Sequence, residues 1–244
     1  NLFHHPIAEV RAIADEVGAK VLFDAAHLCG MIAGKVWPQP LVEGAHLMTF
    51  STYKSLGGPA GGLIVTNDDA ISQKLDAIAY PGLTANFDAA KTAALGVTLQ
   101  DWKAVGADYA QMMVKTSQAL AQNLQSRGVN IYAADKGFTM SHQFAILAAP
   151  YGGGQTAAKR MGSAGLLACG IGLPIAAVEG DLNGLRIGTP EIVRLGMKVE
   201  HMDQLADFIA RSLDTSVEPS EVKHEVTEWR KQFSGVHYTV DLPN

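Results

Sequence analysis

Short apolar segments alternate with helical segments over residues 6–66, and this alternation limits the fold more than any other feature. Apolar residues between Pro6 and Val17 recur at helical spacing, and Gly18 is a natural end for that helix. Buried strands are expected at 20–24, 46–50 and 62–66, with a helical or irregular stretch at 28–33. This order predicts an α/β domain whose mostly parallel sheet is covered by helices.

The second half of the chain is predicted to form a small α+β domain. A long proline-free region at 87–125 predicts a helix that Gly128 closes. Beyond it we expect strands at 131–132, 141–147 and 185–187, and helices at 155–169, 190–195, 201–213 and 218–233. The chain is therefore divided into the C-terminal part of a large domain at 1–105, a connecting helix at 106–128 and a small C-terminal domain at 129–244.

An acid and an amine each stand at the end of a predicted strand. Asp24 ends the first strand, and Lys54 comes shortly after the second, just before the glycine-rich segment 57–62. Ligands gather at the carboxyl ends of strands in such sheets. A Lys amine can hold an aldehyde cofactor as a Schiff base, and a carboxylate keeps a pyridine nitrogen protonated. The pair indicates a pyridoxal phosphate site; the alternative for Lys54 alone is a solvated side chain in a glycine-rich turn.

His27 and Arg186 are the other candidate site residues. His27 lies three positions after Asp24, so a helical turn there would direct its ring to the same pocket. A histidine whose ring is satisfied by nearby backbone is the alternative. Arg186 stands between two apolar strand residues and before Gly188, a placement that suits a bidentate bond to a carboxylate. Its alternative is a surface ion pair.

Composition and motif spacing argue against several other classes of function. The chain has 244 residues, 48% apolar and 18% charged, and a net charge of -5, which gives little reason to expect nucleic acid or an anionic membrane as a partner. The histidines lack metal-like spacing, and the segment 57–62 is no nucleotide P-loop because its Lys precedes the glycines.

The compartment is expected to be the cytoplasm. Cys29 and Cys169 lie in apolar surroundings and are interpreted as reduced core residues. No apolar run is long enough to span a bilayer, and the first residues lack the zones of a signal peptide. The chain starts without Met, so we expect it to be the later part of a longer protein.

Three motifs together resemble the serine hydroxymethyltransferase family among the fold-type I pyridoxal phosphate enzymes. They are Asp24-Ala25-Ala26-His27, the block from Ser51 to Gly62, and Leu185-Arg186-Ile187-Gly188-Thr189-Pro190. They occur in the family's order and at nearly its spacing, and the resemblance extends over nearly the whole chain.

The resemblance implies a role for each residue near the cofactor. Lys54 would bind the cofactor aldehyde, and Asp24 would pair with the pyridinium nitrogen. Ala26 would pack against the ring, His27 would approach the phenolic oxygen, and Ser51 would lie near the cofactor.

It also implies partners. Arg186 would bind the carboxylate of an amino-acid substrate. The segment that contains Gly82 would come from a neighbouring subunit and help to hold the phosphate, which implies a homodimer or homotetramer. The family keeps a ring-stacking His and a substrate-contacting Tyr and Glu in an N-terminal portion that this sequence does not include, so the chain alone would hold an incomplete site.

Three departures from the family bear on the reaction. Tyr53 stands where the family usually has His before the Lys, and Ala60 replaces the Arg of its Gly-Pro-Arg-Gly-Gly. The family's Asn-rich strand that reaches toward folate is not recognisable at 169–174. These differences weaken the case for tetrahydrofolate and fit a folate-independent aldolase branch as well as a divergent hydroxymethyltransferase.

We therefore expect a pyridoxal phosphate-dependent hydroxymethyltransferase that cleaves the Cα–Cβ bond of serine-like β-hydroxy-α-amino acids by retro-aldol chemistry. One alternative is a folate-independent aldolase of α-methylserine or other β-hydroxy amino acids. Two alternatives of other classes are an aminotransferase-like enzyme on the same scaffold and a non-catalytic fragment or scaffold.

Overall fold

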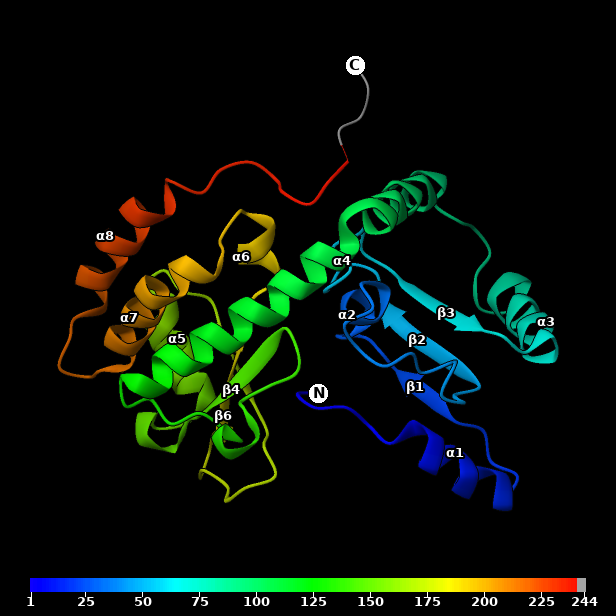
Figure 1. The fold of residues 1–244 in the computed structure, drawn as a ribbon, viewed down its shortest axis with the longest axis horizontal. Coiled ribbons are helices and arrows are strands. Elements are labelled where there is room, and N and C mark those ends of the chain that lie inside the picture. Colours follow the sequence, from blue (N-terminus) through cyan, green and yellow to red (C-terminus); the bar gives the residue numbers. More distant parts are fainter. Residues whose placement is uncertain (241–244) are drawn as a thin grey trace. The chain divides into compact units, whose positions relative to one another are not determined.

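A computed structural model describes residues 1–240 and divides the chain into two compact units. The first unit holds residues 1, 3–110 and, among the described residues, 238–240; the second holds residue 2 and residues 111–237. The long helix α4 (Ala89–Ser126) contributes residues to both (Figure 1). The predicted domain limits 1–105, 106–128 and 129–244 stay a prediction, and positions 241–244 lie outside the described residues.

The first unit is built on a three-stranded sheet in the order β1–β2–β3 (Figure 1). Helix α1 (Ile7–Glu16) precedes β1 (Leu22–Asp24), and α2 (Cys29–Ala33) leads to β2 (Leu47–Ser51). Strand β3 (Gly62–Thr66) is followed by α3 (Asp69–Ala77) and the kinked segment η1 (Ile78–Leu83), in which Tyr80 and Pro81 have non-helical dihedral angles.

Strand register brings Asp24 and Ser51, two of the predicted site residues, to one edge of this sheet. Strands β1 and β2 pair in parallel, with Asp24 opposite Thr49, so both strands end on the same side. Strand β3 pairs antiparallel to β2, with Gly62 opposite Ser51. The α/β class is confirmed, although only one of the two described pairings is parallel. A short connection joins the end of β2 at Ser51 to the start of β3. Such a connection is possible between antiparallel strands, whereas parallel strands need a longer crossover.

The second unit carries an antiparallel sheet in the order β4–β6–β5. Its strands are β4 (Gln143–Leu147), β5 (Cys169–Ile171) and β6 (Gly184–Gly188). Its helices are α5 (Gly154–Ser163), α6 (Pro190–Arg194), α7 (Met202–Leu213) and α8 (Pro219–Arg230), with 3-10 turns η2 (Ala134–Lys136), η3 (Ala149–Tyr151) and η4 (Val199–His201). Helix α5 packs against β5 and β6, and α7 and α8 pack against α5.

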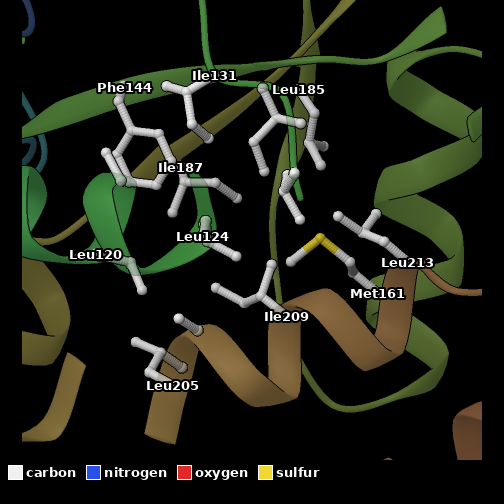
Figure 2. Close-up of a cluster of buried hydrophobic side chains, with 14 of the residues drawn as sticks. Leu120, Leu124, Ile131, Phe144, Met161, Leu185, Ile187, Leu205, Ile209 and Leu213 are labelled. Atoms are coloured by element: carbon white, nitrogen blue, oxygen red, sulfur yellow. The ribbon is translucent and has the colours of Figure 1, made fainter. Parts of the chain in front are cut away.

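The core of the second unit joins α4, the sheet and α7. Figure 2 shows side chains from these elements converging, among them Leu124 of α4, Phe144 of β4 and Ile209 of α7. Leu124 and Phe144 are fully buried. Helix α7 contributes along one face, as its apolar spacing predicts.

Two local predictions for the second unit were wrong. The helix expected at 155–169 ends at Ser163, because Gly165 takes a left-handed φ of 83° and turns the chain into β5. Ile131 forms only an isolated bridge to Ile146 instead of a strand. Within residues 1–240, no helix combines the length and apolarity that a membrane crossing requires.

Candidate active site

Asp24 is the last residue of β1 and stands exposed at the carboxyl edge of the first sheet. Its Oδ1 accepts a hydrogen bond from the backbone N–H of Ala26 at 2.9 Å. The backbone N–H of Ala25 donates to the carbonyl of Thr49 at 2.8 Å, which anchors the turn to β2. The carboxylate is therefore held by its own turn, as Asp side chains commonly are at strand ends.

Lys54 lies three residues beyond the end of β2 and is half-buried. Its Nζ is 3.4 Å from Nε2 of His27 and 6.0 Å from the centroid of the Tyr53 ring. The chain turns immediately after Asp24, with the Leu28 N–H bonded to the Ala25 carbonyl at 2.9 Å. This turn places the His27 imidazole beside the Lys54 amine. The pocket shared with Asp24 that the spacing predicts for His27 stays a prediction.

The glycine-rich segment after Lys54 is a closed loop. The N–H of Thr52 donates to the Gly61 carbonyl at 3.0 Å, and the N–H of Gly58 donates to the Thr52 carbonyl at 2.8 Å. Gly57 adopts a φ of 67°, which favours glycine. The loop thus fixes the backbone on both sides of Lys54.

A second contact fixes the loop against α4. The buried indole of Trp102 donates from Nε1 to the carbonyl of Leu56 at 2.7 Å. Leu56 is itself buried, at 2% exposure. Two residues beyond Lys54, the chain is therefore bound to a long helix.

The other predicted residues of the first unit have less defined contacts. Ala26 is half-buried beside Asp24. Ser51 ends β2, and its carbonyl accepts a weak hydrogen bond from the Cys29 thiol at 3.3 Å. Gly82 lies exposed in η1, next to Leu83, which is 81% exposed. The roles assigned to these three residues stay predictions.

Arg186 belongs to the second unit, where it lies in the central strand β6. It stands opposite Ala145 of β4 and Cys169 of β5 and is half-buried. The strand predicted to carry it is confirmed. Its role toward a substrate carboxylate stays a prediction.

Ser55 was missed by sequence reasoning. Its hydroxyl bonds to the backbone of the segment that carries His27, 28 positions earlier. Its position next to Lys54 carries no pattern from which this bond could be predicted. Cys29 and Ser55 are both buried and lie 3.4 Å apart from Sγ to Oγ, in agreement with the core role predicted for Cys29.

A sequence model of the family described as serine hydroxymethyltransferase matches residues 5–209. The chain belongs to the serine hydroxymethyltransferase family. Within this family it is 60% identical over 238 residues to an alpha-methylserine aldolase of Ralstonia sp, covering 98% of this chain and 54% of the relative. An alpha-methylserine aldolase of Variovorax paradoxus is 61% identical over 240 residues, with coverage of 98% and 54%.

More distant relatives match nearly the whole of this chain as well. A serine hydroxymethyltransferase of Methanobrevibacter smithii is 40% identical over 240 residues, covering 98% of this chain and 56% of the relative. The crystal structure of L-threonine transaldolase from Pseudomonas fluorescens, in its internal aldimine state, superimposes with a TM-score of 0.87 at 25% identity, covering 98% of this chain and 55% of that one. The chain spans about half the length of the curated relatives it matches.

The residues of the first unit fit the pyridoxal phosphate expected of this family. One sheet edge presents an amine that can react with an aldehyde, a carboxylate for a pyridine nitrogen and an imidazole beside the amine. All three come from two neighbouring parallel strands and the turns that follow them. Among residues 1–240, no group of three or more His, Cys, Asp or Glu side chains is arranged to hold a metal ion.

Proposed function

We propose that the intact protein is a pyridoxal phosphate-dependent aldolase that cleaves the Cα–Cβ bond of β-hydroxy-α-amino acids, with α-methylserine as its substrate. The observation that carries the chemistry is the Lys54 amine 3.4 Å from the His27 imidazole, at the sheet edge where Asp24 ends β1. The choice of substrate is supported by relatives named alpha-methylserine aldolase, which are 60% and 61% identical to this chain.

Lys54, Asp24 and His27 would hold the cofactor, with Ala26 and Ser51 beside it. Bound there, pyridoxal phosphate would supply a protonated ring that accepts the negative charge developing on Cα. Asp24 would keep the ring nitrogen protonated, because a nearby carboxylate favours the charged form of its partner. His27 would face the phenolic oxygen of the ring, since its imidazole already lies beside the amine that receives the aldehyde.

Arg186 would bind the substrate carboxylate. A guanidinium offers two parallel N–H donors, so it fixes both the position and the plane of a carboxylate. With the carboxylate held, rotation about the bond between the amino nitrogen and Cα is restricted, and the Cα–Cβ bond keeps one orientation.

The reaction balances without a second cofactor. The hydroxyl proton of α-methylserine is removed, the Cα–Cβ bond breaks, and the β-carbon leaves as formaldehyde. The electron pair remains on Cα, which takes up a proton to give alanine. No acceptor for the one-carbon unit is required, which agrees with Tyr53 and Ala60 standing where the family usually has His and Arg.

The second candidate function is a hydroxymethyltransferase that uses tetrahydrofolate. It is supported by the family assignment and by relatives named serine hydroxymethyltransferase that are 40% identical to this chain. This enzyme would act on serine and would transfer the one-carbon unit to folate.

We also propose that the protein works in the cytoplasm as a homodimer or homotetramer. The segment around Gly82 would then meet a neighbouring subunit. This is supported by the exposure of its apolar neighbours, with Tyr80 at 65%, Leu83 at 81% and Phe87 at 87%. Large exposed apolar patches commonly mark protein–protein interaction sites.

The deciding experiment offers the intact protein α-methylserine and L-serine, each with and without tetrahydrofolate, and follows formaldehyde and amino-acid products. The proposal expects formaldehyde and alanine from α-methylserine at a rate that folate does not change. Turnover of serine that depends on folate would support the hydroxymethyltransferase instead. Formation of a keto acid would indicate an aminotransferase, and no uptake of pyridoxal phosphate would indicate a non-catalytic scaffold.

A further inference from the structure

Ser55 follows Lys54 directly and is almost fully buried, at 2% exposure. Its hydroxyl donates to the carbonyl of His27 at 2.7 Å and accepts from the backbone N–H of Gly30 at 2.9 Å. One short side chain therefore joins the loop that carries Lys54 to the segment that carries His27.

The two segments also approach each other closely through their backbones. A Cβ built on Gly30 would lie 2.5 Å from the carbonyl oxygen of Ser55, so glycine is required there. Gly30 is the second residue of α2, and the residue before this helix, Leu28, makes no capping hydrogen bond with its side chain. Ser55 thus supplies, from a distant part of the chain, an acceptor for one of the N–H groups that a helix start leaves without a partner.

Loss of the hydroxyl would disturb both segments together. Without it, the Gly30 N–H loses its acceptor in a buried position, and buried polar groups without partners are costly. The Gly30 N–H can regain a partner only if water enters or if the two segments separate. Either change alters the placement of His27 relative to Lys54, because the His27 carbonyl is one of the two groups that Ser55 holds.

We propose that Ser55 is a positioning residue whose hydroxyl sets the separation between the Lys54 amine and the His27 imidazole. It acts through these two side chains and contacts neither cofactor nor substrate. This inference rests on the proposed function, because it concerns how this edge of the sheet receives pyridoxal phosphate.

Three variants of the intact protein test this inference. Ser55→Ala removes the hydroxyl, and Ser55→Thr retains it. Ser212→Ala is the matched control, because Ser212 is also buried, at 1% exposure, and its hydroxyl donates to the Ile209 carbonyl at 2.7 Å within α7. The measurements are the Kd for pyridoxal phosphate, the visible circular dichroism per bound cofactor, kcat and KM.

We expect Ser55→Ala to lower kcat by about a hundredfold with a smaller change in KM, as a misplacement of about 1 Å can do. Its Kd for pyridoxal phosphate should rise and its visible circular dichroism per bound cofactor should fall, because the ring is held less firmly. Ser55→Thr should restore these values, and Ser212→Ala should leave them at the wild-type level. A Ser55→Ala protein that merely melts at a lower temperature, as Ser212→Ala does, with unchanged cofactor signals, overturns the proposal.

A second readout needs no cofactor. In the cofactor-free protein, a nuclear Overhauser effect between the His27 ring and the Lys54 ε-methylene should be present in wild type and Ser55→Thr and lost in Ser55→Ala. Its persistence in Ser55→Ala would overturn the positioning role. If wild type binds no pyridoxal phosphate, the proposed function fails, and this comparison still decides the role of Ser55.

Discussion

The Lys54 amine lies 3.4 Å from Nε2 of His27, although 27 positions separate the two residues in sequence. The contact depends on two parallel strands that end at the same sheet edge and on the turns that follow them. A nucleophilic amine beside a group that can accept or donate a proton is a common arrangement for covalent catalysis.

Lys54 is expected to be indispensable for turnover. Lys54→Ala and Lys54→Arg should each reduce formaldehyde release from α-methylserine on the order of a thousandfold or more, because neither side chain can form a Schiff base with the cofactor. Both should also lack the visible band of covalently bound cofactor. The control is Lys115→Ala, which removes an exposed lysine that contacts Gln111 on α4. Full turnover by Lys54→Ala would contradict the assignment.

Asp24 is expected to act through its charge. Asp24→Asn keeps an oxygen that can accept from the Ala26 N–H but loses the negative charge, so it separates turn geometry from electrostatics. We expect kcat to fall by about a hundredfold to a thousandfold, the usual effect of losing one preorganised electrostatic partner. Steady-state kinetics measure this, with Asp76→Asn on the exposed face of α3 as the control. A kcat unchanged in Asp24→Asn would remove the carboxylate from the mechanism.

Arg186 is expected to control substrate affinity. Arg186→Ala should raise KM for α-methylserine by about thirtyfold or more, because losing the partner of a hydrogen-bonded charge costs about 2–5 kcal/mol. Arg186→Lys should recover only part of this, since an ammonium cannot bind a carboxylate through two parallel donors. Arg127→Ala is the control, because Arg127 pairs with exposed Asp203 at the surface. An Arg186→Ala enzyme with wild-type KM would show that another group binds the carboxylate.

The placement of Asp24 and Lys54 at one edge was predictable because it depends on features close in sequence. Each follows a short apolar segment, and neighbouring parallel strands end together. A turn after Asp24 was likewise predictable from the sequence, whereas the approach of the His27 ring to the Lys54 amine depends also on the path of the loop that follows β2.

Features that depend on tertiary approach could not be predicted in this way. The apolar pattern of β3 is the same whether the strand pairs parallel or antiparallel, so its direction could not be predicted. Strand β5 is only three residues long, which is too short for a distinct periodicity. The bond from Ser55 to His27 arises only once two loops have met, and a lone serine after a lysine carries no pattern. The role of Asp181 could not be predicted for the same reason, because it caps a helix that begins 27 positions earlier in the chain.

Asp181 is expected to make the stability of the protein depend on pH in the acid range. Its carboxylate accepts hydrogen bonds from the N–H groups of Gln155 and Thr156 at the start of α5, both at 2.9 Å. These bonds lower the pKa of Asp181 from 3.8 to about 2, and the bond from the Gln155 N–H has the largest effect. Because the pKa is depressed in the folded state, the stabilisation is present above pH 3.8 and is lost as the pH falls toward 2.

Thermal melting between pH 6 and pH 3 tests this for wild type and Asp181→Asn. The variant should have the lower Tm at pH 6, and the gap between the two proteins should narrow as the pH falls, because acid removes from wild type the charge that the variant already lacks. Glu179→Gln is the control, since it removes one exposed negative charge from the same loop. A gap that stays constant from pH 6 to pH 3 would show that Asp181 stabilises α5 without its charge.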